Sequence, residues 1–401
     1  MEIDFSDWLN LIFRWLHLIT GIAWIGTSFY FIFLDLSLRK RKQLPPGVGG
    51  EAWNVHSGGF YLMQKYVVAP DQLPEELHWF KYEAYFTFLS GFALMGVIYY
   101  WGAESFLIDR DVANLSQFEA ILISIGFLAG GWISYDILCR IPLFERNSFF
   151  LSIAVFVLIL LVAWGATNVF SGRAAFVHVG AVVGTIMVAN VFFIIIPNQK
   201  VVVSDLIAGR DPDPSLGKEA KQRSTHNNYL TLPVLLMMVS THFPMIYAHE
   251  QSWLVVALIL IVGGIIRDYF NRKNAGESGR MLQWQWPSAS LFMLILILFT
   301  SYQPRNFSGT SGDVPGASDV LAISQARCTS CHASQPSDPD FSKAPNGVRL
   351  ETIGDLRKYS EQIMKQAVLT RAMPLANRTR ITRKERDMIG FWIRAGMPGD
   401  D

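Results

Sequence analysis

Eight apolar stretches, each long enough to cross the roughly 30 Å hydrocarbon core of a bilayer, recur along the first 303 residues. They occupy approximately residues 8–35, 82–101, 117–138, 149–168, 174–196, 226–248, 252–269 and 285–303. We therefore predict an all-α fold in which residues 1–303 form a polytopic bundle of eight transmembrane helices. An even number of spans places both ends of this bundle on the same side of the membrane.

A different pattern follows the last apolar stretch. Residues 304–317 are rich in Gly, Ser and Pro, which is typical of a flexible linker. Residues 318–401 suffice for a small helical domain. Its first helix is predicted to end within residues 328–332, the second to cover about 354–370, and the third to begin with the capping box formed by Thr382 and Glu385.

Composition agrees with this division and excludes some function classes. Of the 401 residues, 51% are hydrophobic and 17% are charged, a balance typical of a polytopic membrane protein with a small soluble appendage. The net charge of +1 argues against nucleic-acid binding. The first residues lack a basic region, so we expect no cleaved signal peptide. The apolar, glycine-broken segment 54–61 predicts a re-entrant or interfacial cap.

The C-terminal part contains Cys328-Thr329-Ser330-Cys331-His332, the C-x-x-C-H pattern that attaches a c-type haem. A thioredoxin-like redox pair is disfavoured because no βαβ pattern surrounds the motif. Half of a zinc site is disfavoured because the only other cysteine is Cys139. His332 would ligate the haem iron, and we expect Met373 as the sixth ligand, since Met and His form the usual axial pair. Competing methionines are Met364, Met388 and Met397.

Haem attachment and loop charges independently predict one orientation. In bacteria, covalent haem attachment takes place on the outer face of the cytoplasmic membrane, so the C-terminal domain should be periplasmic. The odd-numbered loops with their adjoining helix ends carry 17 Lys and Arg, whereas the even-numbered loops carry 2. By the positive-inside rule the odd loops face the cytoplasm. We expect an inner-membrane protein whose N-terminus is also periplasmic.

Three histidines fall in the predicted periplasmic half of the bundle: His17, His178 and His242. Ionisable residues inside spans usually mark function. Their shared depth predicts a bis-histidine site for a non-covalent haem b held by two of the three. Arg14, one helical turn outward from His17, could pair with the haem propionates. The alternative is that these histidines are hydrogen-bonded packing residues.

The predicted cytoplasmic half carries a larger polar set, interleaved with aromatic rings. A pocket for an anionic heterocycle needs a cation that holds the negative charge, a carboxylate that acts as a base, and aromatic faces that pack on the planar ring, and this set provides all three. The alternative is that these are the charged and aromatic residues commonly found at the ends of membrane helices, without a catalytic role. The candidate catalytic residues are Glu83, Asp136, Arg140, Arg267 and Asp268, and further polar and aromatic candidates are Asp35, His78, His226, Asn227, Asn228, Tyr135 and Tyr229.

Three sequence stretches carry a family resemblance. Residues 14–29, with Arg14-Trp15-Leu16-His17 and Gly21-Ile22-Ala23-Trp24, are followed by Val55-His56-Ser57-Gly58-Gly59-Phe60-Tyr61 and by residues 78–85. Together they resemble the membrane-bound bacterial urate oxidases, in which a membrane domain precedes a C-terminal cytochrome c. The resemblance implies oxidation of urate, a planar anion from purine catabolism, to 5-hydroxyisourate. Electrons would pass to the cytochrome and not directly to dioxygen.

Two other functions remain open at this stage. An electron-transfer relay that oxidises membrane quinol would have a lipid-facing site and would need no arginine. A membrane transporter with a tethered cytochrome would show no redox change when substrate is added. If the chain oxidises urate, the downstream electron acceptor would be a soluble cytochrome or a terminal oxidase.

Overall fold

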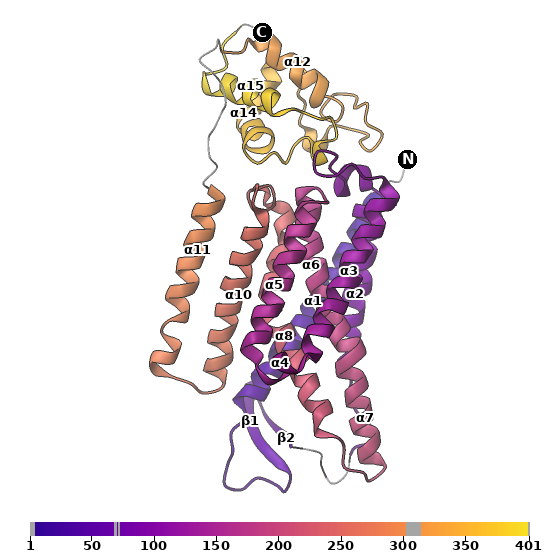
Figure 1. Ribbon diagram of the computed structural model, residues 1–401, viewed down its shortest axis with the longest axis vertical. Helices are drawn as coiled ribbons and strands as arrows, with labels where there is room; N and C mark the ends of the chain where they lie inside the picture. Colours follow the sequence, from indigo (N-terminus) through magenta and orange to yellow (C-terminus); the bar gives the residue numbers. More distant parts are fainter. Residues whose placement is uncertain (1–4, 68–69, 71–72, 302–313, 400–401) are drawn as a thin grey trace.

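The computed structural model describes residues 5–67, 70, 73–301 and 314–399. A long helical bundle carries a smaller helical domain at one end and a two-stranded β-hairpin at the other (Figure 1). We call these the domain end and the hairpin end. The first helix, α1 (Phe5–Ser37), begins at the domain end, so both chain ends lie on the same side of the bundle, as the helix count predicted.

Each of the eight predicted apolar stretches falls largely on helix within the described residues. Two helices continue into π-helices: α2 (Tyr82–Met95) into η1 (Gly96–Tyr100), and α6 (Gly172–Ala189) through η3 (Asn190–Ile195) into α7 (Ile196–Ile207). The other long helices are α3 (Gln117–Arg140), α5 (Ser148–Thr167), α8 (Pro214–Val239), α10 (Ser252–Asn274) and α11 (Gln285–Ser301).

Five helical segments of the described chain are long and apolar enough to cross a membrane: α1, α3, α5, the continuous segment 172–207, and α10. Helix α11 is apolar but shorter. Helix α8 begins with several charged residues, and α2 is continued by a π-helix. The structure is therefore mostly helical with five candidate spans, and the eight-span topology stays a prediction.

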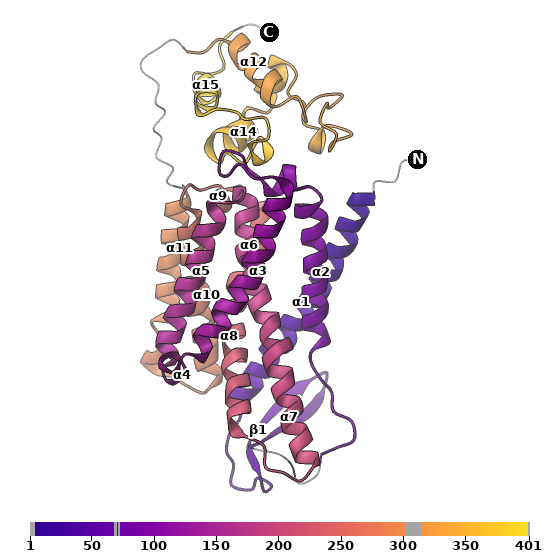
Figure 2. The same cartoon turned by 45° about the vertical axis from the view of Figure 1, so that its right-hand side comes forward.

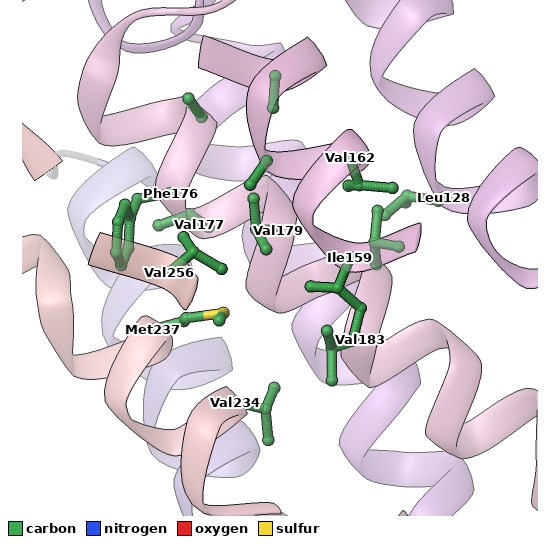
Figure 3. Close-up of a cluster of buried hydrophobic side chains, with 14 of the residues drawn as sticks. Leu128, Ile159, Val162, Phe176, Val177, Val179, Val183, Val234, Met237 and Val256 are labelled. Carbon is green, nitrogen blue, oxygen red and sulfur yellow. The ribbon is translucent and has the colours of Figure 1, made fainter. Parts of the chain in front are cut away.

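Helix α6 lies at the centre of the bundle, in contact with α3, α5 and α8. Its valines and Phe176 meet Ile159 of α5, Met237 of α8 and Val256 of α10 in a continuous apolar core (Figure 3). Close helix approach depends on small residues. A Cβ atom added to Gly131 of α3 would lie 2.4 Å from a methyl group of Val182.

Two features of the bundle differ from the prediction. The helix expected over 226–248 begins at Pro214 and ends at Val239, and is followed by the short helices η4 (Ser240–His242) and α9 (Pro244–Tyr247). Asp213 caps its start by accepting a hydrogen bond from the Ser215 amide at 2.8 Å. Consequently α8 carries a polar first half that the hydropathy pattern alone assigned to a loop.

The second difference is the hairpin. Strands β1 (Val48–His56) and β2 (Gly59–Tyr66) pair antiparallel, so segment 54–61 is not a re-entrant cap and the fold is not purely α. Ser57 and Gly58 both have positive φ, 50° and 76°, as a two-residue hairpin turn requires. Strand β2 is tied to the bundle by the ion pair of Lys65 with Asp35 of α1.

The C-terminal domain confirms two sequence predictions and corrects one. Helix α12 (Ala317–Arg327) ends directly before Cys328, and α15 (Arg383–Arg394) begins with the predicted capping box at Thr382. The helix expected over 354–370 is broken into α13 (Ile353–Lys358), α14 (Ser360–Ile363) and the π-helix η7 (Met364–Leu369). Most of the predicted linker, 304–317, lies outside the described residues.

The C-terminal domain rests on the short π-helix η2 (Ala103–Leu107) at the domain end of the bundle (Figure 2). Ser105 of η2 donates a hydrogen bond to Asp340 at 2.5 Å and accepts one from Arg378. Farther along the interface, Arg371 pairs with Glu250 at 3.1 Å. Polar groups therefore dominate the contact between the two parts.

Candidate functional site

The C-x-x-C-H segment forms a tight turn at the end of α12. The amides of Cys331 and His332 both donate to the Cys328 carbonyl, at 3.2 and 2.9 Å, which gathers two free thiols and one imidazole. The Nδ1 atom of His332 lies 2.9 Å from the Val348 carbonyl. A carbonyl only accepts, so Nδ1 carries the proton and Nε2 is left to bind a metal. These residues fit a covalently attached haem.

Burial influences both thiols before any attachment. It raises the pKa of Cys328 and the pKa of Cys331. Both side chains are therefore protonated at neutral pH in the chain without haem. A protonated thiol is a poorer nucleophile and metal ligand than a thiolate.

The loop that carries Met373 is fixed by backbone contacts. The Met373 amide donates to the Gln366 carbonyl at 2.9 Å, and its carbonyl accepts from the buried Arg386 at 2.6 Å. Burial, and after it the nearby charge of Arg371, lowers the pKa of Arg386 to about 10, so Arg386 stays a cation at neutral pH. By contrast, the competing methionines pack against the domain's apolar core: Met364, Met388 and Met397.

His17 packs between α1 and α2. Its Nδ1 lies 2.9 Å from the Thr87 carbonyl and 3.3 Å from the Ser90 hydroxyl oxygen. Because the carbonyl only accepts, Nδ1 is the protonated nitrogen. A Cβ atom on Gly91 would lie 2.7 Å from the His17 ring, so the ring lies directly against the α2 backbone.

His178 of α6 is completely buried, and both of its ring nitrogens are hydrogen-bonded. Nδ1 donates to the Ala174 carbonyl at 2.7 Å, and Nε2 accepts from the Ser124 hydroxyl at 2.7 Å. The ring stacks on Phe170 with a centroid separation of 4.5 Å. This is the pattern of a satisfied packing histidine.

The structure places the three candidate haem-binding histidines against different neighbours. His17 contacts α2 at Gly91, whereas His178 meets the Tyr99 ring of the π-helix that continues α2. His242 lies exposed in η4 at the domain end. A non-covalent haem held by two of these histidines stays a prediction.

At the hairpin end, Arg267 of α10 is an unusual buried cation. Its side chain is 7% exposed, and its guanidinium lies over the Phe29 ring, 4.2 Å from the centroid. It donates only to amide oxygens, reaching Asn271 at 2.9 Å and Asn228 at 3.2 Å. Within the described residues no carboxylate lies within 4.0 Å of it. A buried cation without a counter-charge costs free energy that an anionic ligand would offset.

Asp268 does not neutralise Arg267. Its carboxylate accepts from Arg272 at 2.8 Å, from Gln285 at 3.2 Å and from the Tyr229 hydroxyl at 3.3 Å. With three donors already in place, this carboxylate holds α8, α10 and α11 together.

Asp136 of α3 lies between two arginines of very different exposure. Arg140 donates to one carboxylate oxygen at 2.7 Å, and Arg223 donates to the other at 2.7 Å. The Arg140 side chain is 60% exposed and the Arg223 side chain 1%. Sequence reasoning placed Arg223 among the loop charges and missed it. The helix-start signal at Asp213 and Pro214 would have placed it inside the bundle.

Glu83 lies in the first turn of α2 at the hairpin end, where a negative charge is favoured by the helix dipole. The adjacent Ala84 is buried in a small apolar cluster with Val188 of α6 and Val191 of η3. Among the described residues no interaction joins Glu83 to Arg267. The structure thus brings these two candidates to the same end of the bundle without a direct contact.

The bundle corresponds to a known family. Residues 4–301 match the family described as urate oxidase N-terminal. The match therefore ends with α11 and does not include the C-terminal domain. The comparisons with curated proteins and with solved structures gave no match.

Proposed function

The chain belongs to the urate oxidase N-terminal family, and on this premise we propose that it is an oxidoreductase that oxidises urate to 5-hydroxyisourate. In this proposal the bundle lies in the bacterial inner membrane with its hairpin end in the cytoplasm. The C-terminal domain, residues 318–401, is a periplasmic cytochrome c. Electrons from urate reach this domain and not dioxygen directly, and then pass to a soluble cytochrome or a terminal oxidase.

The observation that carries the proposal is the environment of Arg267. Urate is a planar anion with adjacent oxygen and nitrogen acceptors, which match the two-pronged donor geometry of a guanidinium. Arg267 is buried, lies on the Phe29 ring and has no carboxylate within 4.0 Å in the described chain. A planar anion bound to this guanidinium would supply the missing counter-charge.

The other hairpin-end candidates take supporting roles. Oxidation releases protons together with electrons, so a carboxylate within reach of the substrate lowers the barrier. Glu83 is the stronger candidate for this base, because Asp268 already accepts three hydrogen bonds. Arg140, exposed beside Asp136, would attract the anion from the cytoplasm.

The balanced reaction converts urate and water into 5-hydroxyisourate, two protons and two electrons. Water supplies the new oxygen, so no oxygen atom from dioxygen is needed. A haem c held by Cys328, Cys331, His332 and Met373 would take up these electrons one at a time. In this chain the polar contacts around Ser105 hold that domain against the end of the bundle opposite Arg267.

One anaerobic experiment separates this proposal from the alternatives. Urate is mixed with the oxidised full-length protein, and the absorption of reduced haem is followed. We expect two equivalents of reduced haem for each urate consumed, and none in Cys328→Ala, whose covalent haem attachment is broken. Reduction by quinol alone would instead indicate an electron relay. Urate uptake by vesicles without any redox change would indicate a transporter.

A further inference from the structure

A chain of hydrogen bonds runs through the hairpin half of the bundle, and its starting point fixes the orientation of two side-chain amides. The Met187 carbonyl can only accept, so the group 2.9 Å away on Asn227 is its amide nitrogen. The Asn227 oxygen must then be the acceptor in its 2.9 Å contact with Asn190. Asn190 therefore presents its nitrogen to this network and points its oxygen elsewhere.

The same Asn190 nitrogen also donates to the Tyr135 hydroxyl at 3.2 Å. The Tyr135 hydroxyl also lies 2.7 Å from Nδ1 of His226. Tyr135 is fully buried, and its hydroxyl joins Asn190 to His226.

After this chain is assigned, a complementary set of buried atoms has no partner in the described part of the structure. The acceptor is the Asn190 oxygen, and the donors are Nε and Nη1 of Arg223 and the side-chain nitrogen of Asn228. Leaving a buried polar group unpaired costs stability. Arg223 and Asn190 both contact Tyr135, so their unpaired atoms need a common explanation, because buried polar groups are nearly always paired.

Geometry places Arg223 and Asn190 on the same aromatic residue. The Arg223 guanidinium lies over the Tyr135 ring, 5.2 Å from its centroid, and Asn190 contacts the hydroxyl of that ring. Asn190 also begins the π-helix η3. Single π-helical turns interrupt α-helices mainly at functional sites, because the extra residue costs stability. The unpaired atoms of Arg223 and Asn190 thus belong to two residues that both contact Tyr135.

We infer that Arg223 and Asn190 form a recognition site for the hydrogen-bonding edge of a planar lactam heterocycle. Arg223 donates to a carbonyl oxygen or an anionic ring nitrogen, while the Asn190 oxygen accepts from a ring N–H. Urate presents both kinds of group, so this inference rests on the proposed function. It adds recognition of the hydrogen-bonding edge of urate to the binding of its negative charge by Arg267. Tyr135 and His226 act as positioning residues that hold Asn190 in the required amide orientation.

The recognition site and Arg267 are linked through neighbouring residues of α8. Asn227 faces α6 and Asn190, whereas Asn228 faces α10 and accepts from Arg267. Arg223 is already paired with Asp136, so its role is the donation of directed hydrogen bonds. Arg267, which has no carboxylate partner among the described residues, supplies the net charge.

The test measures binding to the full-length protein under anaerobic conditions, with haem reduced beforehand so that no turnover occurs. The probes are urate, its N-methylated derivatives, xanthine, uracil and benzoate, a planar anion without a lactam edge. We expect Arg223→Gln and Asn190→Leu each to raise the Kd for urate about tenfold or more. The control Arg210→Gln removes an exposed, ion-paired arginine at the same end and should change Kd less than twofold.

The N-methylated urates test the role of Asn190 directly. If its oxygen accepts from one ring N–H, the wild type discriminates against the derivative methylated at that nitrogen, and Asn190→Leu does not. Benzoate binding should change little in either variant. If Arg223→Gln does not fold, Arg223→Lys, which keeps the charge beside Asp136, replaces it in the binding measurements.

Each outcome decides one of the two proposals. Folded Arg223 and Asn190 variants with wild-type urate affinity would overturn the recognition site while urate oxidation stands. If the wild type binds xanthine and uracil but not urate, and the variants lose this binding, the recognition site is supported and urate is refuted as the substrate. A wild type that binds none of the lactams would overturn the inference, with the free atoms then satisfied by water alone.

Discussion

Arg267 and Asp268 are adjacent in sequence, yet their side chains lie in separate hydrogen-bond networks. Arg267 faces the interior between Phe29 and Asn228, whereas Asp268 is paired with Arg272 on the next turn. Successive helix positions are rotated by about 100°, so neighbouring residues face different partners. The apparent ion pair in the sequence is therefore absent, and a buried positive charge remains available.

This separation predicts different effects for two substitutions. Arg267→Lys retains the charge but loses the planar donor pair and the contact with Phe29, so we expect the KM for urate to rise about tenfold or more. Asp268→Asn removes a carboxylate that joins three helices, so we expect a lower Tm with a KM near that of the wild type. Steady-state haem reduction and thermal unfolding in detergent measure both. Equal KM effects in the two variants would contradict the assignment.

Glu83 is predicted to accept a proton during the reaction. Glu83→Gln keeps the size of the side chain but removes the base, so urate affinity should stay within a few fold. Haem reduction should slow by about 10²-fold, the scale expected for loss of a general base. Glu145→Gln, on the exposed helix α4 (Pro142–Arg146), is the matched control. Normal turnover in Glu83→Gln would show that this residue only stabilises the start of α2.

Met373 is predicted to be the sixth haem ligand, because the other methionines of the domain pack against its core. Met373→Ala should lower the reduction potential and remove the weak sulfur-to-iron absorption band near the red end of the spectrum. Met397→Leu, which preserves apolar packing, should leave that band unchanged. Persistence of the band in Met373→Ala would assign the ligand to another methionine.

Docking of the C-terminal domain is predicted to weaken in acid. The hydrogen bond from Ser105, together with the Arg378 charge, holds the pKa of Asp340 below its ordinary value of 3.8. The docked state thus binds the proton less tightly than the undocked state. The contribution of Asp340 to docking is complete above pH 3.8 and is lost as the pH falls through the lower, docked pKa.

Hydrogen exchange of the η2 amides measures this effect. Exchange should accelerate as the pH falls below 3.8, after correction for intrinsic exchange rates. Asp340→Asn cannot titrate, so its corrected exchange should show no such step. A step of equal size in Asp340→Asn would assign the acid sensitivity to another group.

Two adjacent glycines of α3 make a matched pair for stability. A Cβ atom at Gly131 would clash with Val182 at 2.4 Å, whereas none of the neighbouring atoms lies within 4 Å of a Cβ atom at Gly130. We expect Gly131→Ala to destabilise the bundle by about 1–3 kcal/mol through overpacking. Gly130→Ala should be neutral or stabilising by up to about 1 kcal/mol through helix propensity. Tm values of the two variants in one detergent compare them directly, and an equal fall would refute the close packing of α3 on α6.

Local patterns determined which segments become helical. The predicted apolar stretches fall largely on helix within the described residues, and the helix end at Cys328 and the capping box at Thr382 agree with the prediction. These features depend on residues a few positions apart. The hairpin turn at Ser57 and Gly58 was equally local, and it was missed because the apolar residues around it were read as a membrane cap.

Depth and pairing could be decided only by the tertiary structure. The sequence placed His17 and His178 in one half of the bundle, and only the structure shows that His17 contacts Gly91 of α2 and His178 the Tyr99 ring of η1. Arg223 was counted as a loop charge because hydropathy marks where a membrane segment begins and not where a helix begins. A side chain becomes buried, and its hydrogen-bond partner is chosen, through helices distant in sequence. No pattern along one helix contains that information, because burial and pairing depend on which helix packs against it.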